Sequence, residues 1–122
     1  MGYELRRAAG VARDLELIFD FLFDAALAFG EDQPSAFDRA AERILVIEDA
    51  MEALTAAPHQ GTLREDLLPG LRQVTKGRAV FYFDVKDDAA ILRVLAVFFG
   101  GQDHQRHMLL RLLAPETSQE QP

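Results

Sequence analysis

The sequence predicts an α+β protein in which a helical hairpin packs on an antiparallel sheet, in the order β-α-α-β-β-β with a short C-terminal helix. Two observations lead to this class. The first half carries apolar residues at helical spacing, and the second half carries strand-forming runs joined by polar turns. The 122 residues suffice for one hydrophobic core. We therefore predict a single domain over residues 1–114 and a flexible tail over 115–122.

The first strand is predicted at residues 3–6, where apolar and polar residues alternate. From residue 8 the apolar positions follow helical spacing until Gly30, which commonly ends a helix. The stripe contains Leu15, Ile18, Phe19, Leu22, Ala26 and Phe29. The carboxylates of this segment fall outside the stripe, so we expect them in solvent: Asp14, Glu16, Asp20 and Asp24.

A second helix is predicted after the turn at residues 31–34, capped by Asp32 or Ser35 and stopped by Pro58 and Gly61. Its apolar seam contains Phe37, Ala40, Ile44, Ile47, Met51 and Leu54. Because the turn is short, the two helices should form an antiparallel hairpin.

The second half predicts a connecting loop at 62–70 and three strands, at 71–75, 78–85 and 89–99. Turns at residues 76–77 and 86–88 separate the strands. Asp103 is expected to cap a short closing helix. The residues expected to pack this helix back on the sheet are Met108, Leu109, Leu112 and Leu113.

Side chains of a strand point alternately to its two faces, which assigns the residues of the last two strands. Ala79, Phe81, Phe83 and Val85 should meet the helices, together with Leu92, Val94, Ala96 and Phe98. The open face is then predicted to carry Arg72, Arg78, Tyr82, Arg93, Leu95, Val97 and Phe99. This face is apolar enough to need a cover, either the closing helix or a partner. The alternative for the arginines is that they are solvated and pair with nearby Asp.

The net charge of −7 argues against direct binding of nucleic acid by the whole surface. The charge is unevenly divided, since residues 1–69 hold 14 Asp/Glu and 6 Lys/Arg whereas residues 70–115 hold 4 and 7. No cysteine is present, so the sequence offers no disulfide and no thiolate nucleophile. Without a visible signal peptide or a membrane-length apolar run, we expect a cytoplasmic protein that does not bind membranes.

Catalytic and metal-binding motifs are not found in the sequence: it has no phosphate-binding loop, nucleophile elbow or metalloprotease motif. His104 and His107 are spaced to share one side of a helix, but a metal site would need a third ligand. We expect them, like His59 in its loop, to be ordinary surface residues. No metal or other cofactor is predicted.

The order and spacing of several segments resemble the ParE/RelE family of toxins from bacterial toxin–antitoxin pairs. The resemblance covers residues 3–103 and rests on residues 3–5, Ala8-Ala9 and Asp14-Leu15, Pro58 and Gly61, the run 68–72, Gly77-Arg78 before Phe81-Tyr82-Phe83, and residues 91–97 before Gly101-Gln102-Asp103. It implies a toxin that is held inactive by a ParD-like antitoxin, whose flexible C-terminal segment wraps the toxin in a hetero-oligomer. The implied antitoxin contacts are the helical hairpin and the sheet edge.

Two activities divide this family. RelE-like members cleave mRNA on the ribosome by general acid–base chemistry, and ParE-like members poison DNA gyrase without a known catalytic residue. RelE-like chains tend to be strongly basic, so the acidic composition of this chain favours the ParE side. Many relatives also carry a histidine before the glycine that ends the last strand and an arginine after it, where this chain has Phe99 and Gly101.

The resemblance therefore predicts a non-enzymatic gyrase inhibitor with no catalytic residues. Its partner-binding residues are predicted to be Arg72, Arg78, Tyr82, Arg93, Leu95, Val97 and Phe99. Two alternatives stay open. One is an mRNA endonuclease that uses Arg72, Arg78, Arg93 and His104, in which His104 or His107 replaces the catalytic group that RelE-like members place after the last strand. The other is a binding domain that captures an antitoxin and has no toxic act.

Overall fold

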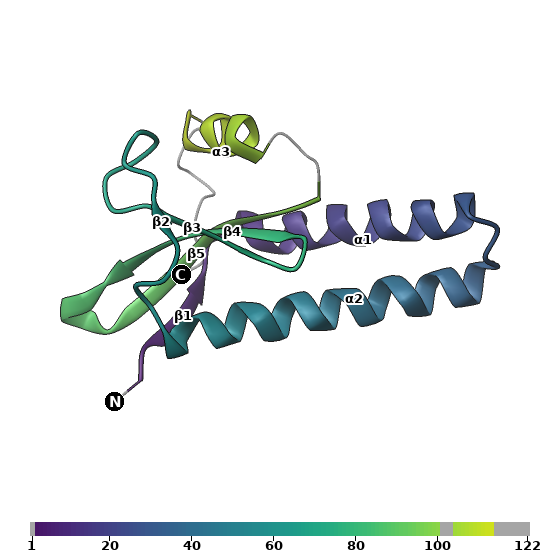
Figure 1. Cartoon of the computed structure of the whole chain (residues 1–122), viewed down its shortest axis with the longest axis horizontal. Coiled ribbons are helices and arrows are strands. Elements are labelled where there is room, and N and C mark those ends of the chain that lie inside the picture. The colour runs from purple at the N-terminus through teal and green to yellow at the C-terminus, as the bar shows by residue number, and fades with distance from the viewer. Residues whose placement is uncertain (1, 101–103, 114–122) are drawn as a thin grey trace.

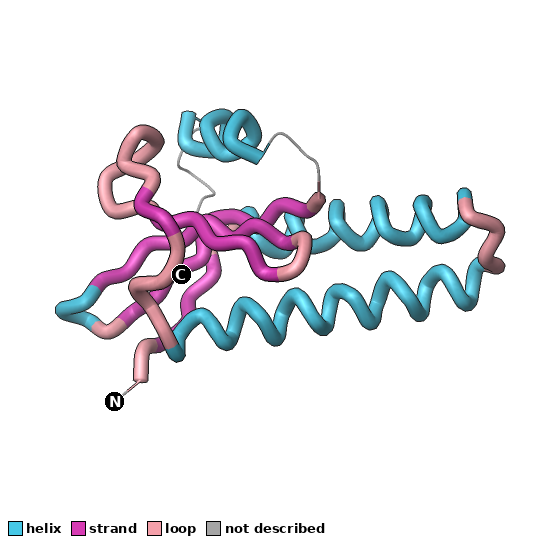
Figure 2. The backbone as a smooth tube through the Cα atoms, viewed as in Figure 1, coloured by secondary structure: helices cyan, strands magenta, loops and turns pink. Residues whose placement is uncertain are grey.

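A computed structural model describes residues 2–100 and 104–113 (Figure 1). The elements are β1 (Glu4–Arg7), α1 (Gly10–Ala28), α2 (Gln33–Ala53), the 3-10 turn η1 (Leu54–Ala56), β2 (Thr62–Leu63), β3 (Arg72–Lys76), β4 (Ala79–Lys86), the 3-10 turn η2 (Asp87–Ala89), β5 (Ile91–Phe99) and α3 (His104–Leu113). The helical hairpin lies on one side of the sheet and α3 lies on the other (Figure 2). The predicted α+β class and element order are confirmed.

The sheet has the strand order β1-β5-β4-β3-β2. The pairs β2–β3, β3–β4 and β4–β5 are antiparallel, as expected, but β1 runs parallel to β5. The predicted antiparallel arrangement of the three long strands is therefore confirmed, and the parallel edge strand β1 makes the sheet mostly antiparallel. A parallel neighbour requires a long crossover connection, and the hairpin begins that connection. β2 falls in the predicted loop, because two exposed residues are too few to show an alternation.

The hairpin forms as predicted, and its ends have identifiable causes. Gly30 follows α1 with φ of +96°, a conformation that glycine adopts without steric cost. The side chain of Asp32 caps α2 by accepting a hydrogen bond from the Ser35 N–H at 2.8 Å. Small residues of the two helices are buried: Ala26, Ala36 and Ala40. The far end of the hairpin extends past the sheet (Figure 1).

This projection explains two errors in the predicted apolar stripes. Phe29 is 90% exposed and Phe37 is 54% exposed, although both have the spacing of core residues. The helical period identifies which face of a helix is apolar, but the sheet is too short to cover that face along its whole length.

Two hydrophobic clusters lie on opposite faces of the sheet. The cluster under the hairpin includes Val11, Leu15, Ile47, Met51, Phe81 and Phe83. The cluster under α3 includes Leu71, Val80, Tyr82, Ala96, Phe98 and Met108. The closing helix therefore covers the open face, which was one of the two covers expected. Met108 is fully buried and Leu112 packs at the margin, whereas Leu109 and Leu113 are exposed because α3 rests on one narrow face.

A β-bulge in β5 corrects the predicted faces of the last strand. Tyr82 pairs with Ala96 and Phe83 pairs with Val94, so Leu95 is an extra residue on β5. Before the bulge the prediction holds, and Leu92 and Val94 lie under the hairpin. After it the alternation is inverted. Val97 and Phe99 therefore belong to the cluster under the hairpin, and Ala96 and Phe98 lie under α3.

Candidate partner-binding site

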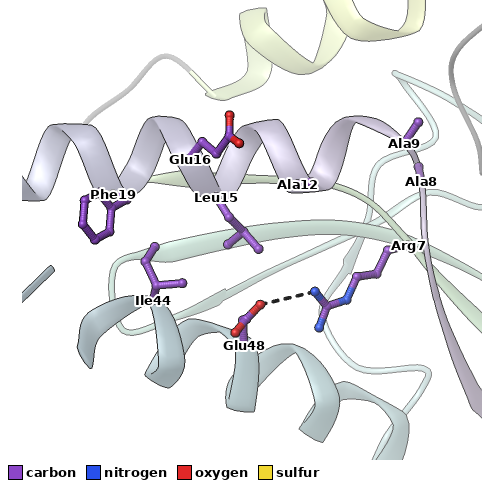
Figure 3. Close-up of a pocket in the computed structure, with 9 residues that line it drawn as sticks. All are labelled: Arg7, Ala8, Ala9, Ala12, Leu15, Glu16, Phe19, Ile44 and Glu48. Carbon is purple, nitrogen blue, oxygen red and sulfur yellow. Dashed lines mark hydrogen bonds and ion pairs between the residues drawn. The ribbon is translucent and has the colours of Figure 1, made fainter. Parts of the chain in front are cut away.

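A groove of about 550 Å³ opens where β1 enters the hairpin (Figure 3). Its walls come from α1 and α2, with Leu15 and Phe19 on one side and Ile44 on the other. Arg7 reaches into the groove from the end of β1 and pairs with Glu48 at 3.4 Å and with Glu52 at 3.7 Å. The groove thus combines an apolar floor with a charged rim, which is the composition of many protein-binding sites.

Aromatic side chains extend this groove along the hairpin. Phe19 stacks on Phe23 at 6.2 Å between ring centroids and meets Phe37 edge-on at 5.2 Å. Further large apolar residues of the two helices are more than two-fifths exposed: Leu17, Phe21, Leu45 and Val46. A soluble protein seldom leaves so many large apolar side chains on one projection unless they meet another molecule.

The residues predicted to share the open face are divided between two faces of the sheet. Arg93 does lie on the predicted face, where it pairs with Asp84 across the strands at 3.1 Å. The alternative of pairing with a nearby Asp therefore describes Arg93. Tyr82 lies on the same face but is completely buried under α3, edge-on to Phe98 at 6.0 Å.

Arg72 and Arg78 lie on the hairpin side instead. Arg72 pairs in register with Phe83 and so shares its face, and its guanidinium donates to the carbonyl of His59 at 2.7 Å. Arg78 lies in the turn before β4, so the alternation of the strand does not apply to it. Its guanidinium sits 4.9 Å from the centroid of the Phe99 ring.

Two of the three apolar residues predicted for partner binding lie on the other face of the sheet, whereas Leu95 stays on the predicted face. Val97 is fully buried and Phe99 is 4% exposed, both on the hairpin side because of the bulge. Leu95 is half-buried beside the cluster under α3. Of the candidate catalytic groups, His104 begins α3, and its side chain lies outside the described part of the structure.

One buried polar site was missed by the sequence analysis. Asp14, expected in solvent, is 4% exposed and faces the edge of β5. Its carboxylate accepts hydrogen bonds from the Val97 N–H at 3.0 Å and from Arg111 of α3 at 2.5 Å. Arg111 also donates to the carbonyl of Leu95 at 2.9 Å. The spacing of apolar residues gives no sign of a carboxylate that is buried because it accepts hydrogen bonds.

The Asp14–Arg111 site makes hydrogen bonds to the edge of β5 beyond the residues that pair with β1. β1 pairs with β5 only as far as Val94, so the following residues of β5 form an open sheet edge. The Asp14 carboxylate and the Arg111 guanidinium satisfy a backbone donor and a backbone acceptor of that edge. The same pair therefore joins α1, β5 and α3. Burial raises the pKa of Asp14, and the bonds to Arg111 and Val97 oppose this without cancelling it.

A second cluster joins segments that are distant in sequence. Asp87 in η2 accepts hydrogen bonds from the Tyr3 hydroxyl and the His59 ring, both at 2.7 Å. The bond to Tyr3, followed by that to His59, lowers the pKa of Asp87, and the same bond raises the pKa of Tyr3. His59 was expected to be incidental, but it holds the loop after α2 against η2. Nothing in the local sequence around His59 indicates this partner.

Two further observations concern the described residues alone. Their His, Asp and Glu side chains form no group of three that could hold a metal ion. None of their helices combines the length and the apolar character that crossing a membrane requires.

Comparisons with known proteins identify the fold. No protein-family model and no curated protein matches the chain. Among solved structures, the chromosomal ParDE toxin–antitoxin system from P. aeruginosa matches with a TM-score of 0.60 and 21% identity, over 80% of this chain and 96% of that one. The toxin–antitoxin complex RelBE2 from Mycobacterium tuberculosis matches with a TM-score of 0.50 and 18% identity, over 81% and 99%. A mutant of the E. coli toxin RelE in the free state matches with 0.57 and 9%, over 93% and 100%.

The chain therefore has the RelE/ParE-like fold, in which two N-terminal helices pack on a mostly antiparallel sheet of five strands. The structural match to the ParDE and RelBE toxins confirms the resemblance that the sequence indicated. At these identities the likeness concerns the fold, and the activity needs a separate argument.

Proposed function

We propose that this chain is the toxin of a type II toxin–antitoxin system, that it inhibits DNA gyrase without catalysing a reaction, and that a ParD-like antitoxin neutralises it in a cytoplasmic complex. The fold supports the toxin class, because solved members of two toxin–antitoxin systems match it over nearly their whole length. The acidic composition supports the ParE side of that class, because docking on ribosomal RNA requires a basic surface.

The observation that carries the non-enzymatic part is the separation of the candidate catalytic arginines. Arg72 and Arg78 lie on the hairpin side of the sheet, at His59 and Phe99 respectively. Arg93 lies on the opposite side and is paired with Asp84. General acid–base cleavage of RNA needs such groups within hydrogen-bond reach of one phosphate and one hydroxyl. Arginines on two faces of a sheet do not meet this requirement.

The groove of Figure 3 is the surface we assign to the antitoxin. It is apolar, it continues into the exposed aromatic residues of the hairpin, and Arg7 and Glu16 offer charges of both signs at its rim. An amphipathic segment of an antitoxin fits this composition, with its apolar face in the groove and its polar face in solvent.

The test is a supercoiling assay with purified gyrase, relaxed plasmid and ATP. The folded chain should lower supercoiling in a concentration-dependent way, and its expression alone in bacteria should cause filamentation and a DNA-damage response. Full supercoiling activity in the presence of folded protein, with rapid loss of translation and cleaved mRNA in the cells, would replace the proposal with the endonuclease. Unaffected growth of the bacteria that express the chain would instead support the alternative of a binding domain without toxicity.

A matched pair of variants tests the groove. Ala12 and Ala28 are both exposed alanines of α1, and only Ala12 lines the groove. The variant Ala12→Arg should stay toxic but escape rescue by a co-expressed ParD-like antitoxin that rescues the wild type, whereas Ala28→Arg should be rescued. Equal rescue of both variants would move the antitoxin site elsewhere.

A further inference from the structure

A second, smaller pocket lies between α2 and the turn that joins β3 to β4. Its volume is about 290 Å³. Arg43 and Val46 of α2 line one side, residues Lys76, Gly77 and Arg78 of the turn line the other, and Phe99 of β5 also belongs to the lining. Three of the lining side chains are cationic and none is a carboxylate. Such a concentration of one charge is unexpected in a chain with a net charge of −7.

Within the described part of the chain, these three cations also differ from most others in having no acidic partner. Seven arginines of the described residues form ion pairs: Arg6, Arg7, Arg13, Arg39, Arg64, Arg93 and Arg111. Within residues 2–100 and 104–113, no ion pair is found for Arg43, Lys76 or Arg78. Their charges repel one another across the pocket, so an anion placed between them would be attracted by all three.

The position of two guanidinium groups is fixed by the fold. The Arg43 and Arg78 groups lie 5.6 and 4.9 Å from the centroid of the same Phe99 ring, where each makes a cation–π contact. Arg78 is held further by Gly100, whose N–H donates to the Arg78 carbonyl at 2.8 Å. A Cβ at Gly100 would stand 2.7 Å from the Arg78 guanidinium, so glycine leaves the space that this side chain occupies. The pocket is thus organised before any ligand arrives.

We propose that this pocket binds a carboxylate side chain of an acidic segment of a partner protein. A carboxylate accepts hydrogen bonds from two guanidinium groups at once, and Val46, which is 60% exposed, offers an apolar contact beside it. A nucleic acid fits less well. Its phosphates continue in both directions, and residues 10–53 beside the pocket hold 11 Asp/Glu against 3 Lys/Arg. This site goes beyond the proposed function, since it does not depend on whether gyrase is the target.

The test follows the backbone amides of Gly77 and Gly100 by NMR while a peptide is added to the ¹⁵N-labelled chain. The probe is the peptide acetyl-Leu-Asp-Leu-Glu-Leu-amide, and its control replaces the two acids by Asn and Gln. We expect saturable shifts of both amides with the acidic peptide and binding weaker by about tenfold with the amide control. Equal binding of the two peptides would overturn the proposal.

Two lysines provide a matched control for net charge. Lys76 lines the pocket, and Lys86 is an exposed lysine at the end of β4 without an ion pair among the described residues. Lys76→Gln and Arg43→Gln should each weaken peptide binding by about fivefold, and Lys86→Gln should leave it unchanged. An equal loss with Lys86→Gln would show a general charge effect and contradict a site.

Single-stranded RNA and inorganic phosphate complete the test. Tighter binding of either than of the acidic peptide at these amides would assign the pocket to phosphates and overturn the carboxylate proposal. The measurement uses no toxicity readout. A chain that binds the peptide but leaves gyrase active would therefore refute the proposed function alone, and the converse would refute the pocket alone.

Discussion

Asp14 is a carboxylate kept in the interior by hydrogen bonds and by its ion pair with Arg111. Burying a charge costs free energy, and the raised pKa of Asp14 indicates that its partners do not fully offset this cost. Its contribution to the fold is to position other elements. The Asp14 side chain accepts a hydrogen bond from the open edge of β5, and through Arg111 it contacts α3, the helix that covers Tyr82. The residue therefore serves the arrangement of three elements more than the stability of the whole.

This reasoning gives a pH-dependent expectation for Asp14→Asn. A raised pKa means that the native state binds the Asp14 proton more tightly than the unfolded state does. The favourable contribution of this group is complete below the unfolded pKa and is lost as the pH rises through the raised native pKa. The free energy of unfolding of the variant, relative to the wild type, should therefore increase as the pH rises through this range.

Urea denaturation at a series of pH values measures this difference. Asp20→Asn, at an exposed position of the same helix, is the control for removing a carboxylate from α1. A difference between Asp14→Asn and the wild type that is independent of pH, or that has the opposite slope, would contradict the expectation.

We expect α3 to be held in part by the Asp14–Arg111 pair, and Gly10 gives a way to disturb that pair without removing either partner. A Cβ at Gly10 would stand 2.7 Å from a terminal nitrogen of Arg111. Gly10→Ala should therefore displace the guanidinium from Asp14 and from the Leu95 carbonyl, although alanine at this first position of α1 favours the helix, by less than the about 0.8–1.0 kcal/mol found in a helix interior.

Hydrogen exchange resolves these two opposite effects. The amides of α3 should exchange faster by about tenfold, which corresponds to losing roughly one hydrogen bond to a charged group, about 1.5 kcal/mol. The amides of α1 should be equally or better protected. Gly2→Ala is the matched control, because a Cβ at Gly2 meets nothing within 4 Å. Unchanged exchange in α3 would mean that Arg111 does not hold this helix.

The elements also show what could be predicted from the sequence. The helices, the three long strands and the Asp32 cap follow from local patterns, because spacing, turn residues and capping residues act over a few positions. Leu95 has no such pattern: an extra residue in an apolar strand looks like any other apolar residue. The bulge consequently inverted the predicted faces of Val97 and Phe99, and with them part of the candidate binding site.

The remaining site residues depended on contacts between distant segments. Arg111 meets Asp14 across 97 positions, and His59 meets Asp87 across 28. Arg43 lies on a helix and Arg78 in a turn, so only the folded arrangement brings them to one ring. The sequence indicated a basic second half, but it did not indicate which cations find no acidic partner among the described residues.

The whole molecule has an acidic hairpin whose exposed residues include large apolar side chains. Phe29 is 90% exposed and Leu45 is 60% exposed, on a segment with 11 Asp/Glu and 3 Lys/Arg. Like charges keep such surfaces apart in dilute salt, and the range of this repulsion falls from about 10 Å at 0.1 M to about 3 Å at 1 M. The isolated chain should therefore self-associate more as the salt concentration rises.

Sedimentation velocity at increasing sodium chloride concentration tests this expectation. Phe29→Ser and Leu45→Ser should reduce the association at high salt without changing the fold, because both side chains are exposed. A chain that stays monomeric at all salt concentrations would show that the hairpin surface is not adhesive.

The extra residue in β5 has a consequence for how this chain can change in length. Before Leu95, even-numbered positions such as Leu92 and Val94 lie under the hairpin, and after it odd-numbered positions such as Val97 and Phe99 do. Deleting Leu95 itself would leave every later side chain on its present face, because Val94 would still pair with Phe83 and Ala96 with Tyr82. Inserting or deleting a residue within the paired positions of the strand would instead move each later side chain to the opposite hydrophobic layer. Leu95 is therefore the one position of this strand at which we expect a single deletion to be tolerated.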